Sequence, residues 1–283
     1  MYESYWKLNE KPFENTPDPR FIYLSQRHDE ALSRMLYAMR ERKGAALLTG
    51  EYGSGKTLLS RVFWQELQQE HKYQAAFILN PCLQGIEFVK EIYYQLSGGR
   101  DVPGTKIDLF HLLHKLLYSK YDEGKHCIIV VDEAQAIQSE EIFEELRLLL
   151  NFQLNDSFLL TLILVGQPEL KEKINNLPQL RQRIAIRYHL KALSEELTRE
   201  YILHRLKVAG AGVEIFSEDS FSEIYKFSAG IPRRINNICD MALLVGFSEQ
   251  VGKINKEIIM EVAEDLEETT AHEEESAGLQ ING

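Results

Sequence analysis

The sequence predicts an α/β protein in which a parallel five-stranded sheet flanked by helices is followed by an all-helical region. Short apolar runs alternate with segments of helical periodicity up to residue 192, and only helical periodicity follows. This alternation is typical of a parallel sheet whose strands are joined by crossover helices. The expected strands are residues 45–49, 73–79, 127–131, 158–165 and 186–190.

A glycine-rich loop joins the first expected strand to a helix at 58–69, whose apolar residues recur at helical spacing. The loop fits the pattern G-x-x-x-x-G-K-[ST] at each fixed position. Glycines let backbone N–H groups converge on phosphate oxygens, and the helix N-terminus adds the positive end of its dipole. The expected phosphate-binding residues are Gly50, Glu51, Tyr52, Gly53, Ser54, Gly55, Lys56 and Thr57.

The third expected strand ends in two carboxylates, Asp132 and Glu133. The carboxyl ends of parallel strands form the edge at which such sheets bind ligands. We therefore expect Asp132 and Thr57 to hold Mg²⁺, while Lys56 reaches the β- and γ-phosphates of ATP. Glu133 is expected to orient and deprotonate the attacking water.

Two neighbouring strands end in side-chain amides. Asn80 follows 73–79, and Gln167 follows 158–165. If the acidic strand lies between these two, both amides reach the γ-phosphate region. We expect Gln167 to hydrogen-bond the attacking water or the γ-phosphate, and Asn80 to hold Glu133 in an unproductive pose until a partner arrives. The alternative is that both amides only cap strand ends.

Arginines further along the chain are candidates for contacting the γ-phosphate. Arg181 and Arg183 lie about as far from the phosphate loop as a trans-acting arginine does in ring ATPases, and we favour Arg183. Ordinary surface ion pairs are the alternative for either residue. Arg233 follows a proline in the first turn of an expected helix, where it is placed to report the nucleotide state to the helical region. Arg234 should point about 100 degrees away around that helix.

Composition is that of a soluble globular protein, with 44% hydrophobic and 27% charged residues. No apolar run approaches the roughly 18 residues needed to cross a bilayer, and the N-terminus lacks the layout of a secretory signal. Cys82, Cys127 and Cys239 are widely spaced among apolar neighbours, so we expect buried free thiols and a reducing cytoplasm. His111 and His114 are close but lack further ligands, so we expect no metal site there.

The net charge of −11 is unevenly distributed. Residues 261–275 contain eight acidic side chains and no Lys or Arg, which leaves a net charge of about −3 for the rest of the chain. Residues 269–283 have almost no large apolar side chains and are expected to be a disordered, solvated tail, with a docking role as the alternative. An acidic body argues against nonspecific DNA binding, which depends on Lys and Arg.

Together these motifs resemble the AAA+ superfamily, and within it the secretion ATPases of the general secretion pathway protein A kind and their relatives at exopolysaccharide and protein-sorting loci. The resemblance covers about residues 1–265. Its most distinctive segments are TPDPRF at 16–21, VDEAQ at 131–135, LVGQPEL at 164–170, RYHL at 187–190 and IPRRIN at 231–236.

The resemblance implies an ATPase core followed by a helical lid, with sensor roles for Gln167 and Arg233 and with the Pro-Asp-Pro-Arg segment at 17–20 lying over the nucleotide. Four parts are expected. They are an N-terminal segment packing over the nucleotide site (1–43), the AAA+ ATPase core (44–192), the helical lid (193–268) and the acidic tail (269–283).

The resemblance also implies ATP and Mg²⁺ as cofactors, self-association through ATP-bridged interfaces, and a nucleotide cycle that drives or regulates assembly of a bacterial secretion or envelope-export machine. Longer members continue into a membrane span, whereas this chain stops in its acidic tail. We therefore expect a cytoplasmic protein that reaches the inner membrane through a separate membrane or envelope partner. A DNA-associated regulator of transposition type and a scaffold that binds ATP but scarcely hydrolyses it are the alternatives.

Overall fold

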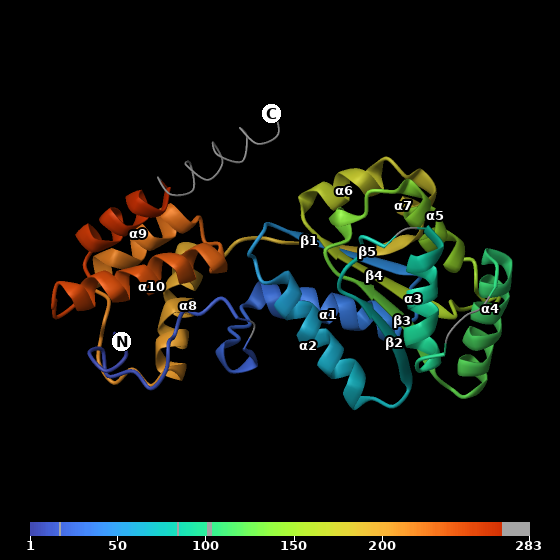
Figure 1. The fold of residues 1–283 in the computed structure, drawn as a ribbon, viewed down its shortest axis with the longest axis horizontal. Coiled ribbons are helices and arrows are strands. Elements are labelled where there is room, and N and C mark those ends of the chain that lie inside the picture. The colour runs from blue at the N-terminus through green and yellow to red at the C-terminus, as the bar shows by residue number, and fades with distance from the viewer. Residues whose placement is uncertain (17, 84, 101–103, 268–283) are drawn as a thin grey trace. The chain divides into compact units, whose positions relative to one another are not determined.

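The computed structural model describes residues 1–16, 18–83, 85–100 and 104–267, which divide into two compact units (Figure 1). One unit is Gln26–Lys191, and the other combines Met1–Ser25 with the chain from Ala192 onward. The predicted acidic tail, 269–283, lies outside the described residues.

The sheet of the first unit has five parallel strands in the order β2-β3-β4-β1-β5. The predicted sheet is therefore confirmed, and the acidic strand β3 lies between β2 and β4, which are the strands that end in Asn80 and Gln167. Each predicted boundary is within two residues of the observed one. The strands are β1 (Ala45–Gly50), β2 (Tyr73–Ile78), β3 (His126–Val131), β4 (Leu160–Gly166) and β5 (Ile184–Leu190).

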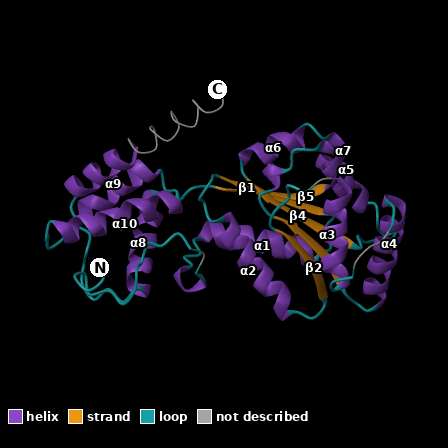
Figure 2. Cartoon of the chain, in the orientation of Figure 1, coloured by secondary structure: helices purple, strands orange, loops and turns teal. Residues whose placement is uncertain are grey.

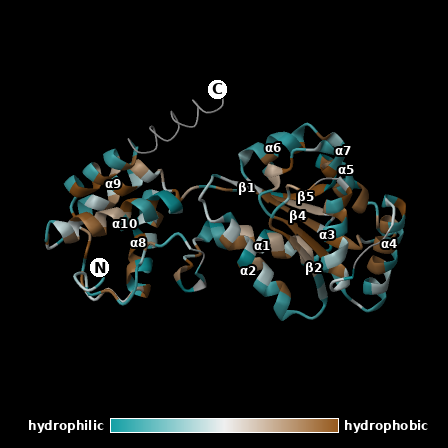
Figure 3. Cartoon of the chain, in the orientation of Figure 1, coloured by the Kyte–Doolittle hydropathy of each residue, from teal (hydrophilic) through white to brown (hydrophobic). Residues whose placement is uncertain are grey.

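Helices cover both faces of this sheet (Figure 2). One face carries α1 (Gln26–Arg40) and α2 (Lys56–Gln69), and the other carries α3 (Gly85–Ser97), α4 (Lys106–Asp122) and α5 (Glu140–Leu149). Every residue of β3 is buried because both of its faces are covered, which explains its continuous apolar run (Figure 3). The edge strand β5 instead alternates between buried and more exposed residues.

Successive residues of β3 point into two separate apolar cores. Val130 packs in the core shared with α1 and α2, and Val131 packs in the core shared with α3, α4 and α5. Ser139 caps the start of α5, since its hydroxyl accepts a hydrogen bond from the Glu141 N–H. This packing fixes the carboxyl end of β3 at the edge where β1 and β4 also end.

Three short elements lie between β3 and β5, and the first two of them begin at this edge of the sheet. A 3₁₀ turn, η2 (Ala134–Ala136), comes directly after β3, and α6 (Pro168–Asn175) comes after β4. A proline occupies the first turn of both α6 and α7 (Pro178–Arg183), which suits a position where no backbone N–H is needed. The alternation of strands and helices had not predicted these three elements as such, because each is too short to show a helical period.

The second unit is helical, as predicted, and its α-helices lie in four stretches of the described residues after Lys191. They are α8 (Glu195–Val208), α9 (Glu218–Ser228), α10 (Pro232–Ser248) and helical residues 256–267. Gly230 precedes α10 with a φ of 70°, and a Cβ there would lie 2.0 Å from the carbonyl oxygen of Leu193. Among the helices of the described residues, none combines the length and the apolar character needed to cross a membrane.

Residues 1–25 pack in the helical unit. The Arg205 guanidinium donates hydrogen bonds to the carbonyl oxygens of Pro12 and Glu14, and the Trp6 indole donates one to the carbonyl of Leu243. The segment predicted as one piece, 1–43, is therefore divided between the two units. Its aromatic first part fills the helical core, whereas the amphipathic helix α1 covers the sheet.

Candidate nucleotide-binding and hydrolysis site

The phosphate loop connects β1 to α2 and has the backbone conformation that its glycines allow. Gly53 and Gly55 have φ values of 77° and 97°, in the left-handed region that other residues rarely adopt. Gly50 has no such φ, but a Cβ there would lie 2.8 Å from the backbone oxygen of Leu190 on β5. The helix α2 begins at Lys56, so its free N–H groups face the loop. The predicted strand, loop and helix are thus present in the order required.

Lys56 is folded back over the loop to which it belongs. Its ammonium donates hydrogen bonds to the carbonyl oxygens of Gly50 and Glu51, both at 2.8 Å. Burial lowers the pKa of Lys56, and the negative charges of Glu133 and Asp132 partly oppose that shift. The carboxylate pair at the end of β3 therefore acts electrostatically on the lysine of the phosphate loop, as a shared site requires.

Asp132 lies against the start of α2, and only 1% of it is exposed. Burial raises its pKa, while hydrogen bonds from the Glu133 N–H and the Thr57 hydroxyl act in the opposite direction. The Thr57 and Asp132 oxygens are thus neighbours, and hard oxygen donors of this kind suit Mg²⁺ together with substrate phosphates. The described residues contain no cluster of three or more His, Cys, Asp or Glu side chains that could hold a metal ion.

Glu133 follows Asp132 in a left-handed backbone conformation, with a φ of 50°. For a residue with a Cβ this conformation costs roughly 1–2 kcal/mol, so the surroundings must hold it. Its Oε2 accepts hydrogen bonds from two amides, Gln135 Nε2 at 2.5 Å and Gln167 Nε2 at 3.3 Å. The structure thus brings Glu133 and Gln167 together, two of the predicted site residues.

Gln135 is the residue in this cluster that the sequence analysis left without a role. Besides donating to Glu133, its amide oxygen accepts a hydrogen bond from the Gln167 backbone N–H at 3.0 Å. The predicted restraint on Glu133 by Asn80 is not present, because the Asn80 side chain caps its own loop by accepting from the Cys82 N–H at 3.2 Å. The spacing Glu-x-Gln on a short turn after β3 was the available signal for Gln135.

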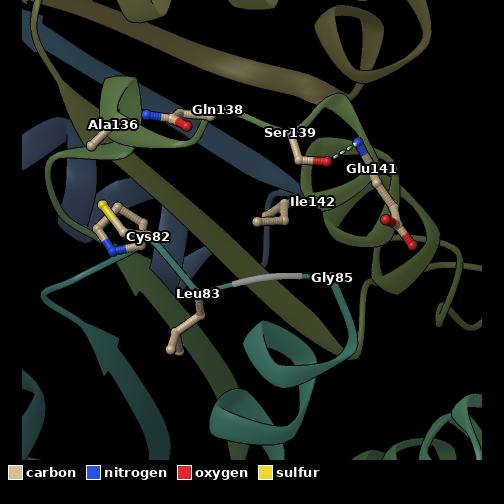
Figure 4. A pocket seen from close by; sticks show the side chains of 9 residues that line it. Cys82, Leu83, Gly85, Ala136, Gln138, Ser139, Glu141 and Ile142 are labelled. Atoms are coloured by element: carbon tan, nitrogen blue, oxygen red, sulfur yellow. Dashed lines mark hydrogen bonds between the residues drawn. The ribbon is translucent and has the colours of Figure 1, made fainter.

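A cavity of about 310 Å³ lies beside these loops, between the segment that follows β2 and the start of α5 (Figure 4). None of the predicted site residues is among the described residues that line this cavity. The lining residues are Pro81, Cys82, Leu83, Gly85, Ala136, Gln138, Ser139, Glu141 and Ile142. Cys82 is exposed here, so the prediction of a buried thiol is wrong for it and right for Cys127 and Cys239.

The buried His28 of α1 contacts the phosphate loop. Its Nε2 lies 3.2 Å from the Ser54 carbonyl oxygen, and a Cβ on Gly55 would lie 3.1 Å from the same nitrogen. Burial lowers the pKa of His28, which favours the neutral imidazole. The structure thereby gives His28 a place beside the loop that its distance in the sequence did not reveal.

The candidate arginines differ in their surroundings. Arg183 donates to the Leu150 carbonyl at 3.2 Å and to Asn151 Oδ1 at 2.9 Å, and so caps the end of α5. The Arg181 side chain is exposed, with no hydrogen bond or ion pair to the described residues. Arg233 lies in the first turn of α10, in the helical unit, as its preceding proline indicated. Within the sheet unit, neither Arg181 nor Arg183 has a described hydrogen bond or ion pair to Glu133.

Comparison with known proteins adds a family to this geometry. Residues 39–174 match the family described as AAA domain. General secretion pathway protein A of Aeromonas hydrophila is 40% identical over 258 residues, which cover 90% of this chain and 46% of that protein. This chain therefore spans about half the length of that relative.

Solved structures share the fold at low sequence identity. The ORC2 protein of Aeropyrum pernix, in its ADPNP-ADP complexes, has a TM-score of 0.62 at 17% identity, over 90% of this chain and 71% of that one. A Walker-type ATPase of Pyrococcus abyssi has a TM-score of 0.60 at 20% identity, over 95% and 81%. Likeness at these identities concerns the fold alone.

Proposed function

Because this chain is an AAA+ ATPase similar to general secretion pathway protein A, we propose that its nucleotide cycle drives or regulates assembly of a bacterial secretion or envelope-export machine. The main support for ATP hydrolysis is that the end of β3 lies next to the phosphate loop. There the Thr57 side chain acts to lower the pKa of Asp132, and the next residue, Glu133, accepts a hydrogen bond from Gln167 at the end of β4. A carboxylate pair beside a phosphate loop suits hydrolysis of ATP better than binding alone.

Each side chain has a distinct part in the proposed reaction. The phosphate loop from Gly50 to Thr57 grips the triphosphate through backbone N–H groups, and Lys56 turns from its own loop carbonyls to the β- and γ-phosphates. Thr57 and Asp132 would hold Mg²⁺. When bound, that ion neutralises charge on the β- and γ-phosphate oxygens. Glu133 accepts the proton of the attacking water, and Gln167 orients that water or the γ-phosphate.

We further propose that the protein self-associates, with an arginine of one copy reaching the nucleotide of the next. Arg183 was favoured from sequence, but its guanidinium is engaged in capping α5. The exposed Arg181, two residues earlier in α7, is available without breaking such a contact. Arg233 is proposed to link the nucleotide state to the helical unit, and residues 17–20 to lie over the nucleotide.

The proposed location is the cytoplasm, with attachment at the inner membrane through a membrane or envelope protein. Support comes from the relative, whose name places it in general secretion. The test is affinity capture from native membranes with Glu133→Gln in the presence of ATP, using Lys56→Ala as the nucleotide-free control. Capture of envelope-assembly proteins by the first variant alone supports the proposal. Capture of transposase or nucleic acid would instead support a DNA-associated regulator.

A further inference from the structure

The side chain of Lys173, on α6, is tied to the turn that carries Gln135. Its ammonium donates hydrogen bonds to the carbonyl oxygens of Gln135 at 2.6 Å and Ile137 at 2.7 Å. The first carbonyl belongs to the middle residue of η2, the turn between β3 and α5, and the second belongs to the residue that follows η2. Bonds from a charged donor are stronger than neutral ones, so Lys173 fixes the backbone from which the Gln135 side chain extends.

The Gln135 amide uses both of its ends. The nitrogen donates to Glu133 Oε2, and the oxygen accepts the N–H of Gln167. A rotated amide would place its oxygen against the carboxylate and its nitrogen against an N–H donor, so only one orientation satisfies both contacts. Gly166 leaves the space for this contact, because a Cβ there would lie 2.7 Å from the Gln135 amide oxygen. The end of β4 and the catalytic turn are therefore joined through one side chain.

Glu133 is held at one oxygen only. Both amide donors bind Oε2, and among the described residues no hydrogen bond reaches Oε1. A carboxylate fixed in this way keeps its second oxygen available to accept a proton, while its strained backbone is held by the surrounding contacts.

We propose that Gln135 and Lys173 are positioning residues for ATP hydrolysis, which hold the Glu133 carboxylate ready for the attacking water and connect it to helix α6. This inference rests on the proposed hydrolytic function. Among the described residues, neither side chain has a hydrogen bond to the phosphate loop, so their loss should slow turnover without weakening ATP binding. Because α6 follows Gln167 directly, movement of α6 would change the pose of Glu133.

The test compares steady-state ATP turnover, ATP affinity and thermal unfolding of the full chain carrying Gln135→Ala, Lys173→Met or Lys173→Arg. Lys171→Met is the matched control, since Lys171 is exposed on the same helix. We expect Gln135→Ala and Lys173→Met to lower kcat by about tenfold or more, with ATP affinity within about twofold of the wild type. Lys173→Arg, which keeps a charged donor, should recover most of the rate, and Lys171→Met should leave it unchanged.

Unchanged kcat in Gln135→Ala and Lys173→Met would overturn the inference. A higher kcat would also overturn it, because Gln135 and Lys173 would then restrain Glu133 rather than position it. Parallel loss of ATP affinity and melting temperature would show that these bonds only hold the fold. A wild-type protein without turnover would refute the proposed function itself. Turnover that Glu133→Gln abolishes, but that these variants leave intact, would refute the inference alone.

Discussion

The Lys56 ammonium donates a hydrogen bond to the carbonyl oxygen of Gly50, six positions earlier in the same loop, at 2.8 Å. In the proposed reaction this bond is exchanged for bonds to the triphosphate. We expect Lys56→Met to weaken ATP binding by about 10-fold to 100-fold, the range for losing hydrogen bonds from a charged donor. Titration of each protein with ATP and Mg²⁺ by calorimetry measures this directly. Equal ATP affinities of the wild type and Lys56→Met would contradict a role of Lys56 in ATP binding.

The same lysine predicts a pH dependence. Burial lowers its pKa from the usual 10.5, so its proton is lost at a lower pH than that of an exposed lysine. ATP affinity should therefore fall as the pH rises through that lowered pKa. Lys56→Arg is the control, because its guanidinium keeps its charge and should give a flat profile over this range. Identical profiles for the two proteins would show that another group titrates.

Asp132 predicts opposite effects on function and stability. Its raised pKa means that the folded protein disfavours the charged carboxylate, so this group's contribution to stability is greatest in acid and declines as the pH rises through that pKa. Asp132→Asn should therefore unfold at a higher urea concentration than the wild type at pH 7, yet lose Mg²⁺-dependent turnover. Urea unfolding and activity assays check both parts. A less stable variant would contradict the assigned cause of the pKa shift.

Gly230 offers a test of the helical unit. An alanine there combines a φ of 70° with a Cβ only 2.0 Å from the Leu193 carbonyl oxygen. We expect Gly230→Ala to reduce the free energy of unfolding by at least about 2 kcal/mol. Gly212→Ala is the matched control, since nothing lies within 4 Å of its Cβ position, and it should change stability by less than about 0.5 kcal/mol. Similar stabilities for the two variants would contradict the packing described at Gly230.

Substitutions of Arg183 and Arg181 distinguish an arginine that caps a helix from one that acts between subunits. Arg183→Ala should lower the free energy of unfolding by about 1–2 kcal/mol, because two hydrogen bonds to the end of α5 are lost. Self-association predicts that specific ATPase activity rises with protein concentration. Arg181→Ala should reduce this rise and leave the free energy of unfolding unchanged. Specific activity that stays flat with wild-type concentration would remove the support for any trans-acting arginine.

Much of the sheet unit was predictable because each strand is a short apolar run bounded by turn residues, and β3 and β4 are buried at every position. The phosphate loop and the Asp132–Glu133 pair were predictable because their chemistry requires fixed residues at fixed spacing. The order of the strands was only a condition in the sequence analysis, and the structure supplies it by placing β3 between β2 and β4.

The contacts around Glu133 were not predictable in the same way. An amide such as Asn80 or Gln135 can cap a turn or reach across to a neighbour, and the sequence does not distinguish these uses. The choice depends on how the ends of β2, β3 and β4 meet, which is set by the register of the sheet. The role of Arg183 between subunits stays a prediction, and the sequence did not show that the packing of α7 on α5 brings its guanidinium to the Leu150 carbonyl.

The central claim, that Glu133 makes this chain an ATP hydrolase, is tested most directly by steady-state phosphate release from the wild type and Glu133→Gln at saturating ATP and Mg²⁺. The account predicts turnover at least about 100-fold lower in the variant, because the general base is lost, while its ATP affinity is retained. Equal rates of phosphate release by the two proteins would contradict it.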